Sequence, residues 1–390
     1  MTRHTGARKI ADKEIGGTPV RSLGRELRGW ARERWISLGM LVMLLAALQS
    51  SAVGTAAPGH LARQQPCAGV LNSDEVAALP DGPRTVGQRL SPQPDLGRYT
   101  CTLTRAADSG GSLPWLTVNA VVQPDDVEYA LREALQDPRR ERWLSLPDAL
   151  PGVLLEGRHF RPAIVLLLPC PDLGTDAAGR SRSVLVRTEY TGHDGIDFLG
   201  TRTTDDLLTV ALTATHATTE LLGCGASPLP EPTTRIGWKE DGVPVAAAAT
   251  PCAVIVPELP AEAAPEGWRM REAPADAGPA SFCEVRAPEG GGLLVNGWFG
   301  GWSESLRVAL GQWSGVSELP PAQQGELTAD ARQATATASC DGEHALFQVR
   351  AYDGDDLFTE AEIREVLTVF ATDQAQRRGC TGIELPQGWE

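Results

Sequence analysis

Eight cysteines, arranged as two series of four, constrain this 390-residue chain more than any other feature of its sequence. An even number of cysteines beyond a candidate export segment is typical of disulfide bonds, because thiols are oxidised outside the cytoplasm. A zinc knuckle is disfavoured, since successive cysteines lie 28 to 69 residues apart and no Cys-x-x-Cys pair occurs. We therefore predict four disulfides and no free thiol among Cys67, Cys101, Cys170, Cys224, Cys252, Cys283, Cys340 and Cys380.

The two series of cysteines mark a tandem repeat. Pro66-Cys67-Ala68 recurs as Pro251-Cys252-Ala253, and the 22-residue segments 203–224 and 359–380 align without a gap and both end in Gly-Cys. Self-similarity of this kind indicates an ancient duplication. We expect the chain to divide into a basic cytoplasmic tail at 1–35, a signal anchor or signal peptide at 36–57, a stalk at 58–65, a first disulfide-bridged domain at 66–224, a linker at 225–251 and a second disulfide-bridged domain at 252–390.

Within each series we predict that the first cysteine pairs with the second and the third with the fourth. These bonds would close loops of 31 to 54 residues. By the chain-entropy estimate each bond contributes roughly 3.5 to 4 kcal/mol. The sequence alone leaves the two other connectivities within each series open.

The sequence of each copy predicts two β-hairpins and two helices. Residues 203–224 and 359–380 have apolar side chains at helical spacing, and Thr359 with Glu362 forms a capping box. Helices are also expected at 125–136 and 303–312. Alternating and β-branched runs predict strands that pair as 98–105 with 115–122, 161–168 with 183–190, 280–287 with 292–299, and 333–339 with 345–351.

These elements indicate an α+β fold. We expect two similar domains, each a mainly antiparallel four-stranded sheet with helices on one face, after an N-terminal signal-anchor helix. Each copy has roughly 130 to 160 residues, which is enough to bury a hydrophobic core.

The charge distribution indicates that the N-terminal tail and the rest of the chain lie in different environments. Residues 1–35 have a net charge of +5 and the remainder has −20. The uncharged segment 36–57 has 22 residues. A membrane span needs about 20, with the basic flank in the cytoplasm. We therefore expect a cell-membrane protein, single pass with its C-terminal region outside.

Two alternatives for the N-terminus remain open. If the apolar run ends at Leu48, it is the apolar part of a signal peptide, with Ser50 and Ala52 placed as at a cleavage site, and the protein is secreted. If translation starts at Met40, the basic tail is an artefact of the start codon.

The overall charge and the missing motifs exclude several function classes. A net charge of −15 disfavours nucleic-acid binding, which needs clustered cations against the phosphates. The sequence has no Gly-x-Ser-x-Gly elbow, His-Glu-x-x-His motif, phosphate-binding loop or EF-hand spacing. We expect no cofactor and no metal. Beyond the stalk, the potential bases among histidines are His159, His193, His216 and His344, and no motif recruits them.

One short segment carries a resemblance to a known class of domains. Residues 67–79 read Cys-Ala-Gly-Val-Leu-Asn-Ser-Asp-Glu-Val-Ala-Ala-Leu, a cysteine followed by a short helix, and each copy ends in Gly-Cys. The copies thereby loosely resemble the cysteine-bridged envelope domains of actinobacterial lipoproteins and the extracytoplasmic sensor domains of membrane kinases. The second copy departs from the pattern after Cys252, and no lipidated cysteine follows the apolar segment. The resemblance implies a binding or sensing module.

Two constellations are candidates for a binding site. A Tyr-x-Gly-x-Asp segment occurs in both copies, and a paired polar loop of Tyr190, Asp194, Tyr352 and Asp356 could meet a cationic group, although such residues also form ordinary strand-to-helix turns. Trp298 and Trp302 form a candidate binding surface, although tryptophans also fill cores and domain interfaces.

The favoured function is a non-catalytic, membrane-anchored or secreted envelope protein whose duplicated domains bind an unknown envelope ligand or partner protein. The alternative is an extracytoplasmic hydrolase with a site between the two domains. An enzyme should show a concave pocket with at least two convergent titratable groups, whereas a binding module should show a groove or patch without such a pair.

Overall fold

The computed structural model divides the chain into two units, Met1–Thr55 and Ala56–Glu390. The described residues are 65–385 without 81, 108–109, 137–141, 158–159, 178, 192–200, 235–241, 249–250, 261–266, 273–277, 307–332 and 353–356. The basic tail, the apolar segment and most of the stalk therefore lie outside the described residues. Along the part of the chain that is described, every helix is too short or too polar to cross a membrane.

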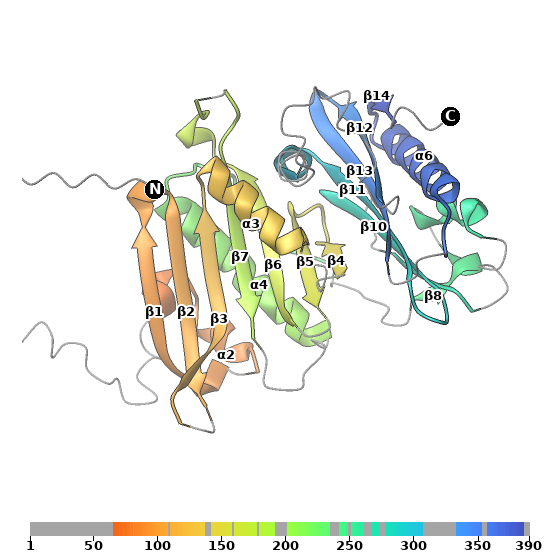
Figure 1. The fold of residues 1–390 in the computed structure, drawn as a ribbon. Helices are drawn as coiled ribbons and strands as arrows, with labels where there is room; N and C mark the ends of the chain where they lie inside the picture. The colour runs from red at the N-terminus through yellow and green to blue at the C-terminus, as the bar shows by residue number, and fades with distance from the viewer. Residues whose placement is uncertain are drawn as a thin grey trace, which may run out of the picture. The chain divides into compact units, whose positions relative to one another are not determined.

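The second unit contains two antiparallel sheets of seven strands (Figure 1). The first sheet has the order β1-β2-β3-β7-β6-β5-β4, with β1 at Thr85–Gln93, β2 at Arg98–Ala106, β3 at Ser112–Val121, β4 at Arg142–Ser145, β5 at Gly152–Gly157, β6 at Phe160–Pro169 and β7 at Ser183–Tyr190. The second has the order β14-β12-β13-β11-β10-β9-β8, with β8 at Val243–Pro244, β9 at Arg269–Glu272, β10 at Ala280–Arg286, β11 at Gly292–Phe299, β12 at Gln333–Cys340, β13 at Glu343–Tyr352 and β14 at Thr381–Glu384. We call residues 65–234 the first half and residues 242–385 the second half.

The helices are few and mostly short. The α-helices are α2 at Ser73–Ala78, α3 at Pro124–Gln136, α4 at Thr201–Leu221 and α6 at Glu360–Arg377, and residues 301–306 are also helical. Single 3-10 turns are η2 at Pro66–Gly69, η3 at Gly82–Arg84, η4 at Pro94–Leu96, η5 at Pro171–Leu173, η6 at Val245–Ala247 and η7 at Cys252–Glu258. The predicted capping box of Thr359 and Glu362 is present at the start of α6 and confirms the predicted helix start.

The predicted fold class is wrong in the size of the sheets. All four predicted hairpins are confirmed, as β2 with β3, β6 with β7, β10 with β11 and β12 with β13. Each sheet nevertheless has seven strands instead of the predicted four. The described part of the chain is therefore mostly β rather than α+β. The missed strands lie toward the sheet edges, where β1 contains Gly87 and Pro92, and β4, β8, β9 and β14 have at most four residues. Such segments lack the alternation on which strand prediction depends.

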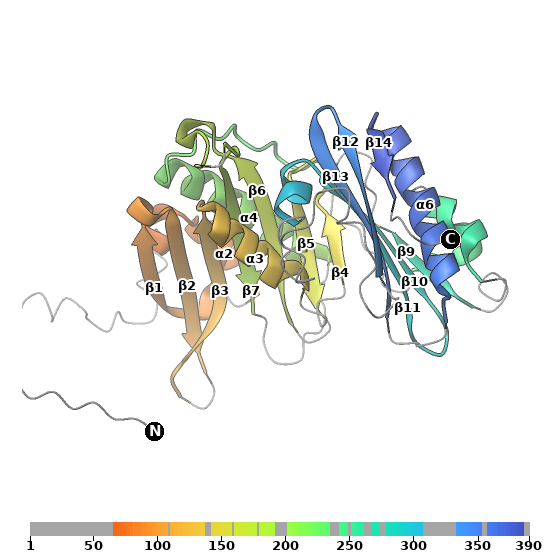
Figure 2. The ribbon, with the colours of Figure 1, turned by 45° about the horizontal axis from the view of Figure 1, so that its top comes forward.

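The placement of helices on one face is also wrong for the first sheet. Along β6, Ile164, Leu166 and Leu168 pack in the core that contains α4, whereas Ala163, Val165 and Leu167 pack in the core that contains α3. Figures 1 and 2 show α3 on one face of this sheet and α4 on the other. Both faces of β6 are therefore buried, which explains its almost continuous apolar sequence.

The two sheets share five strands in the same order. β1-β2-β3-β7-β6 in the first corresponds to β9-β10-β11-β13-β12 in the second, and every neighbouring pair is antiparallel. The register agrees as well, because Cys101 lies opposite Val118 and Cys283 lies opposite Val295. Equivalent positions in the two halves can therefore be compared residue by residue.

The second half has its own core between its sheet and α6. Cys283, Val285 and Val295 face this core together with Phe347 and Phe370. Because side chains alternate along a strand, Phe282, Asn296 and Trp298 point to the opposite face.

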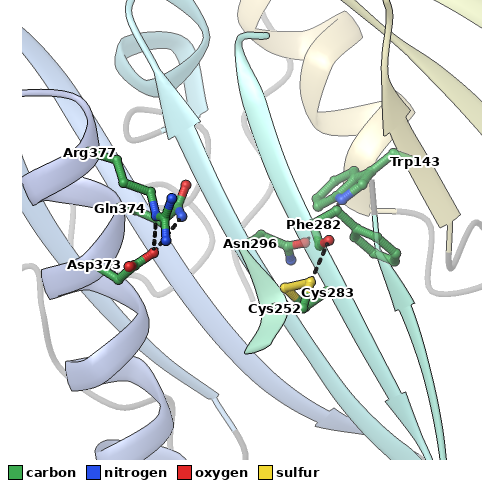
Figure 3. Close-up of a disulfide and its surroundings, with 8 residues drawn as sticks. All are labelled: Trp143, Cys252, Phe282, Cys283, Asn296, Asp373, Gln374 and Arg377. Atoms are coloured by element: carbon green, nitrogen blue, oxygen red, sulfur yellow. Dashed lines mark hydrogen bonds and ion pairs between the residues drawn. A yellow bond between two sulfur atoms is a disulfide. The ribbon is translucent and has the colours of Figure 1, made fainter. Parts of the chain in front are cut away.

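The predicted disulfide pairing is confirmed. The bonds join Cys67 to Cys101, Cys170 to Cys224, Cys252 to Cys283 and Cys340 to Cys380, and the described residues include no free cysteine. Figure 3 shows the bond that joins Cys252 at the start of η7 to Cys283 on β10. Each bond lies within one half, so that no disulfide joins the two halves.

Candidate functional site: the aromatic face of the second sheet

A set of aromatic and apolar side chains covers part of the second sheet on the side opposite α6. We call this the aromatic face and define it by Phe282, Asn296, Trp298, Trp302 and Leu346. Trp298 and Trp302 stack with ring centroids 5.7 Å apart and an interplanar angle of 15°. Trp298 is 1% exposed and Trp302 is 2% exposed. The two predicted surface tryptophans therefore lie close together, as expected, but they are buried.

The residue that covers the aromatic face is Trp143, on β4 of the first half. Its ring meets that of Trp298 edge to face at 4.2 Å between centroids, and that of Phe282 at 6.4 Å. Its indole nitrogen donates a hydrogen bond of 3.0 Å to Oδ1 of Asn296. Figure 3 shows Trp143 beside Phe282 and Asn296. The indole is thus half-buried with its one polar atom satisfied, which removes the main cost of taking that atom out of water.

Further polar contacts flank this indole. The hydroxyl of Ser145, also on β4, donates to the carbonyl oxygen of Ala280. The indole nitrogen of Trp302 donates to the carbonyl oxygen of Pro151 at 3.4 Å. A Cβ added to Gly278 would lie 2.8 Å from Cβ of Ser145. A residue larger than glycine at position 278 would therefore collide with Ser145. The hairpin formed by β4 and β5 therefore packs closely against the aromatic face.

A buried ion cluster lies beside the aromatic face, around Glu284. Glu284 is fully buried, and its carboxylate accepts hydrogen bonds from Arg286 Nε at 2.7 Å and from the Tyr352 hydroxyl at 3.0 Å. Arg271 pairs with its other oxygen at 3.5 Å. Burial, and next the charge of Glu284, raise the pKa of Tyr352 well above its usual value. Because every oxygen of the carboxylate has a partner, the cluster is organised for structure rather than for proton transfer.

A small cleft lies between α3, the start of β7 and the helical segment 301–306. It encloses about 70 Å³, room for a few water molecules. We call it the central cleft, and its polar lining residues are Glu128, Arg180, Ser181, Ser183, Glu304 and Ser305.

Arg180 and Glu128 of the central cleft are already paired. Arg180 donates to Glu128 at 2.6 Å and to Asp176 at 2.7 Å, and these hydrogen bonds, above all the one to Asp176, raise the pKa of Arg180. Glu304 lies 3.7 Å from Nε2 of His344. The lining thus offers hydroxyls and compensated charges, which suit the binding of a polar group.

The predicted polar loop is not brought together by the described residues. Tyr190 is 1% exposed and packs edge to face on Trp115 at 6.1 Å, in the core on the α4 side of its sheet. Tyr352 lies on the face of its sheet opposite α6, where it contacts Glu284. The strand register explains the difference, because Val118 lies opposite Thr188 whereas the equivalent Val295 lies opposite Val349. Tyr190 and Tyr352 are therefore one position out of equivalence and point to opposite faces.

The other predicted residues fall outside the described part or on its surface. Asp194, Asp356, His159 and His193 lie outside the described residues. His216 is exposed on α4, 3.3 Å from Glu220. In the described ranges no group of three or more His, Cys, Asp or Glu side chains is arranged to hold a metal ion.

Sequence reasoning missed Trp143, Asn296 and Glu284. Glu284 carried a signal, because it is a charged residue between Cys283 and Val285 inside a predicted strand, where a partner is required for burial. Trp143 and Asn296 carried none, since their contact spans 153 residues of sequence. Comparison of the chain with protein-family models, with curated proteins and with solved structures finds no match.

Proposed function

We propose that this chain is a non-catalytic envelope protein whose exported part binds a ligand or partner protein at the central cleft. The observation that carries the proposal is the pairing of charges there. Glu128 is paired with Arg180 at 2.6 Å, so that this carboxylate does not stand ready as a general acid or base. Hydroxyls of Ser181, Ser183 and Ser305 supply hydrogen-bonding groups around them.

Site-specific photo-cross-linking in intact cells tests this proposal. A photoreactive amino acid in place of Ser305 should give a discrete cross-linked species. The same residue in place of His216, exposed on α4, is the control and should not give that species. Identical patterns from both positions, or no species from Ser305, would contradict binding at the cleft.

The alternative, an extracytoplasmic hydrolase, draws support from one feature of the same cleft, which takes carboxylates from both halves. It predicts that the purified protein hydrolyses ester or glycoside substrates. It also predicts that Glu128→Gln and Glu304→Gln each abolish that turnover. Binding without turnover favours the first proposal.

For localisation we propose that residues 36–57 anchor the protein in the cell membrane with the C-terminal region outside. Support comes from the length of the apolar segment and from its basic flank. The protein should stay with membranes after alkaline extraction and keep its N-terminal tail. A mature N-terminus near residue 53 would show instead that the segment is a cleaved signal peptide.

We further propose that the two halves arose by tandem duplication, as the repeated cysteine pattern and the shared order of five strands support. The proposed ligand site uses one half's α3 and the other half's segment 301–306, which occupy the same place in the order of elements.

A further inference from the structure

The first half lacks the aromatic face at its equivalent positions. With Cys101 equivalent to Cys283 and Val118 to Val295, the counterparts of Phe282, Leu294 and Trp298 are Thr100, Thr117 and Val121. Thr100 and Thr117 are half-buried, and neither is part of a hydrophobic core. Val121 is apolar and packs in the core that contains α3, so that it is the aromatic character that is specific to the half on which β4 docks.

We infer that the aromatic face is a protein-docking surface whose occupant is the β4–β5 hairpin of the same chain, with Trp143 as its anchor. The contact has the composition of a strong protein interface, because the half-buried ring of Trp143 packs edge to face on Trp298 and Phe282 and hydrogen bonds flank it. Its hydrophobic cluster mixes Val153, Leu155 and Val165 of the first half with Trp298 and Leu346 of the second.

The contact between the β4–β5 hairpin and the aromatic face, rather than the linker, then holds the two halves together. All four disulfides lie within a half, so that only the chain between residues 225 and 251 joins the halves covalently. The close approach at Gly278 fits a lasting contact, because any side chain there would collide with Ser145. The β4–β5 hairpin already occupies the aromatic face. A partner protein must therefore bind elsewhere on the molecule.

Cutting the linker of the intact, oxidised protein tests the inference. A protease recognition sequence replaces residues 235–240, and the cleaved protein is followed by analytical ultracentrifugation over a range of concentrations without reductant. The two fragments should sediment as one 1:1 complex. Separate fragments from the cleaved parent protein would overturn the inference.

Variants of the cut protein test the anchor. Trp143→Ala should weaken the association of the fragments at least about 30-fold, as loss of a central tryptophan does at interfaces. Tyr129→Ala removes a 58% exposed aromatic ring from the same half and should leave the association unchanged. Equal effects of the two substitutions would also overturn the inference.

A second variant covers the case in which Trp143→Ala prevents the first half from folding. Gly278→Ala places a methyl group against Ser145 without removing any core side chain, and it should weaken the association while both disulfides of each half still form. Undiminished association of the Gly278→Ala fragments would contradict the docking of β4 at this place.

Discussion

The indole nitrogen of Trp143 donates a hydrogen bond of 3.0 Å to the side-chain oxygen of Asn296, which lies 153 residues later in the chain. The equivalent asparagine of the first half, Asn119, accepts instead from Thr100 on the neighbouring strand at 3.3 Å. The same position in two similar sheets thus serves a local contact in one half and a long-range contact in the other.

This relationship predicts a measurable coupling between the two side chains. Trp143→Phe and Asn296→Ala should lower the free energy of unfolding by amounts that are not additive, with an interaction energy of about 1 kcal/mol for the lost hydrogen bond. A double-mutant cycle in urea unfolding gives this value. The pair Trp143→Phe with Asn119→Ala shares no contact and should be additive within about 0.5 kcal/mol; an equal coupling in both cycles would contradict a direct bond.

The buried carboxylate of Glu284 should be among the most sensitive positions in the second half. Glu284→Gln removes the negative charge that Arg271 and Arg286 face, and breaking such a buried cluster costs about 3 to 5 kcal/mol. The free energy of unfolding in urea measures this loss. Glu289→Gln, an exposed acid four residues beyond β10's Val285, should change stability by less than about 0.5 kcal/mol.

Alkaline pH should destabilise the protein through the buried Tyr99 and the half-buried Tyr352. Burial raises the pKa of Tyr99 and, together with Glu284, that of Tyr352. The folded state therefore keeps both hydroxyls protonated where the unfolded chain, with a tyrosine pKa of about 10, releases its protons. Stability is then fully present below pH 10 and falls above it, by up to about 1.4 kcal/mol per pH unit for each tyrosine.

Urea unfolding between pH 8 and pH 11 measures this fall. Tyr352→Phe should make the decline shallower, whereas Tyr129→Phe at an exposed position should not alter it. If the decline of stability with pH is unchanged in Tyr352→Phe, this hydroxyl ionises as readily in the folded protein as in the unfolded chain.

The turn between β4 and β5 should respond to acid at an unusually low pH. Hydrogen bonds from Thr234, side chain first and then backbone, and from Thr233 lower the pKa of Asp148 to about 2. A depressed pKa means that these bonds are intact above the unfolded value of about 4 and are lost as pH falls through 2. The amide NMR signal of Thr234 should titrate with a midpoint near 2 and not at all in Asp148→Asn; a midpoint near 4 would contradict the contact.

Local chemistry made part of the fold predictable. The repeat divided the cysteines into two matching sets, which limited each disulfide to one half, and the bonds Cys67–Cys101 and Cys252–Cys283 follow that division. The β12–β13 hairpin was predictable from Asp341-Gly342, and both residues adopt the positive φ that such a turn requires.

The other features of the fold depend on packing between residues far apart in the chain, which cannot be predicted from local sequence patterns. β4 has only four residues, and its identity as a strand depends on pairing with β5 and on docking at the aromatic face. The repeated Tyr-x-Gly-x-Asp segment did not reveal that a shift of one residue in register turns Tyr190 and Tyr352 to opposite faces of their sheets. Trp298 was predicted to lie on a binding surface, whereas the fold buries it against Trp302 and Trp143.

Hydrogen exchange in increasing urea measures whether docking of Trp143 joins the two halves into one cooperative structure. Mass spectrometry of peptides from α4 and from α6 reports the opening of each half separately. Both helices of the oxidised parent protein should open at the same urea concentration, and Trp143→Ala should separate the two midpoints. Two distinct midpoints in the parent protein, unchanged by Trp143→Ala, would contradict this role of Trp143.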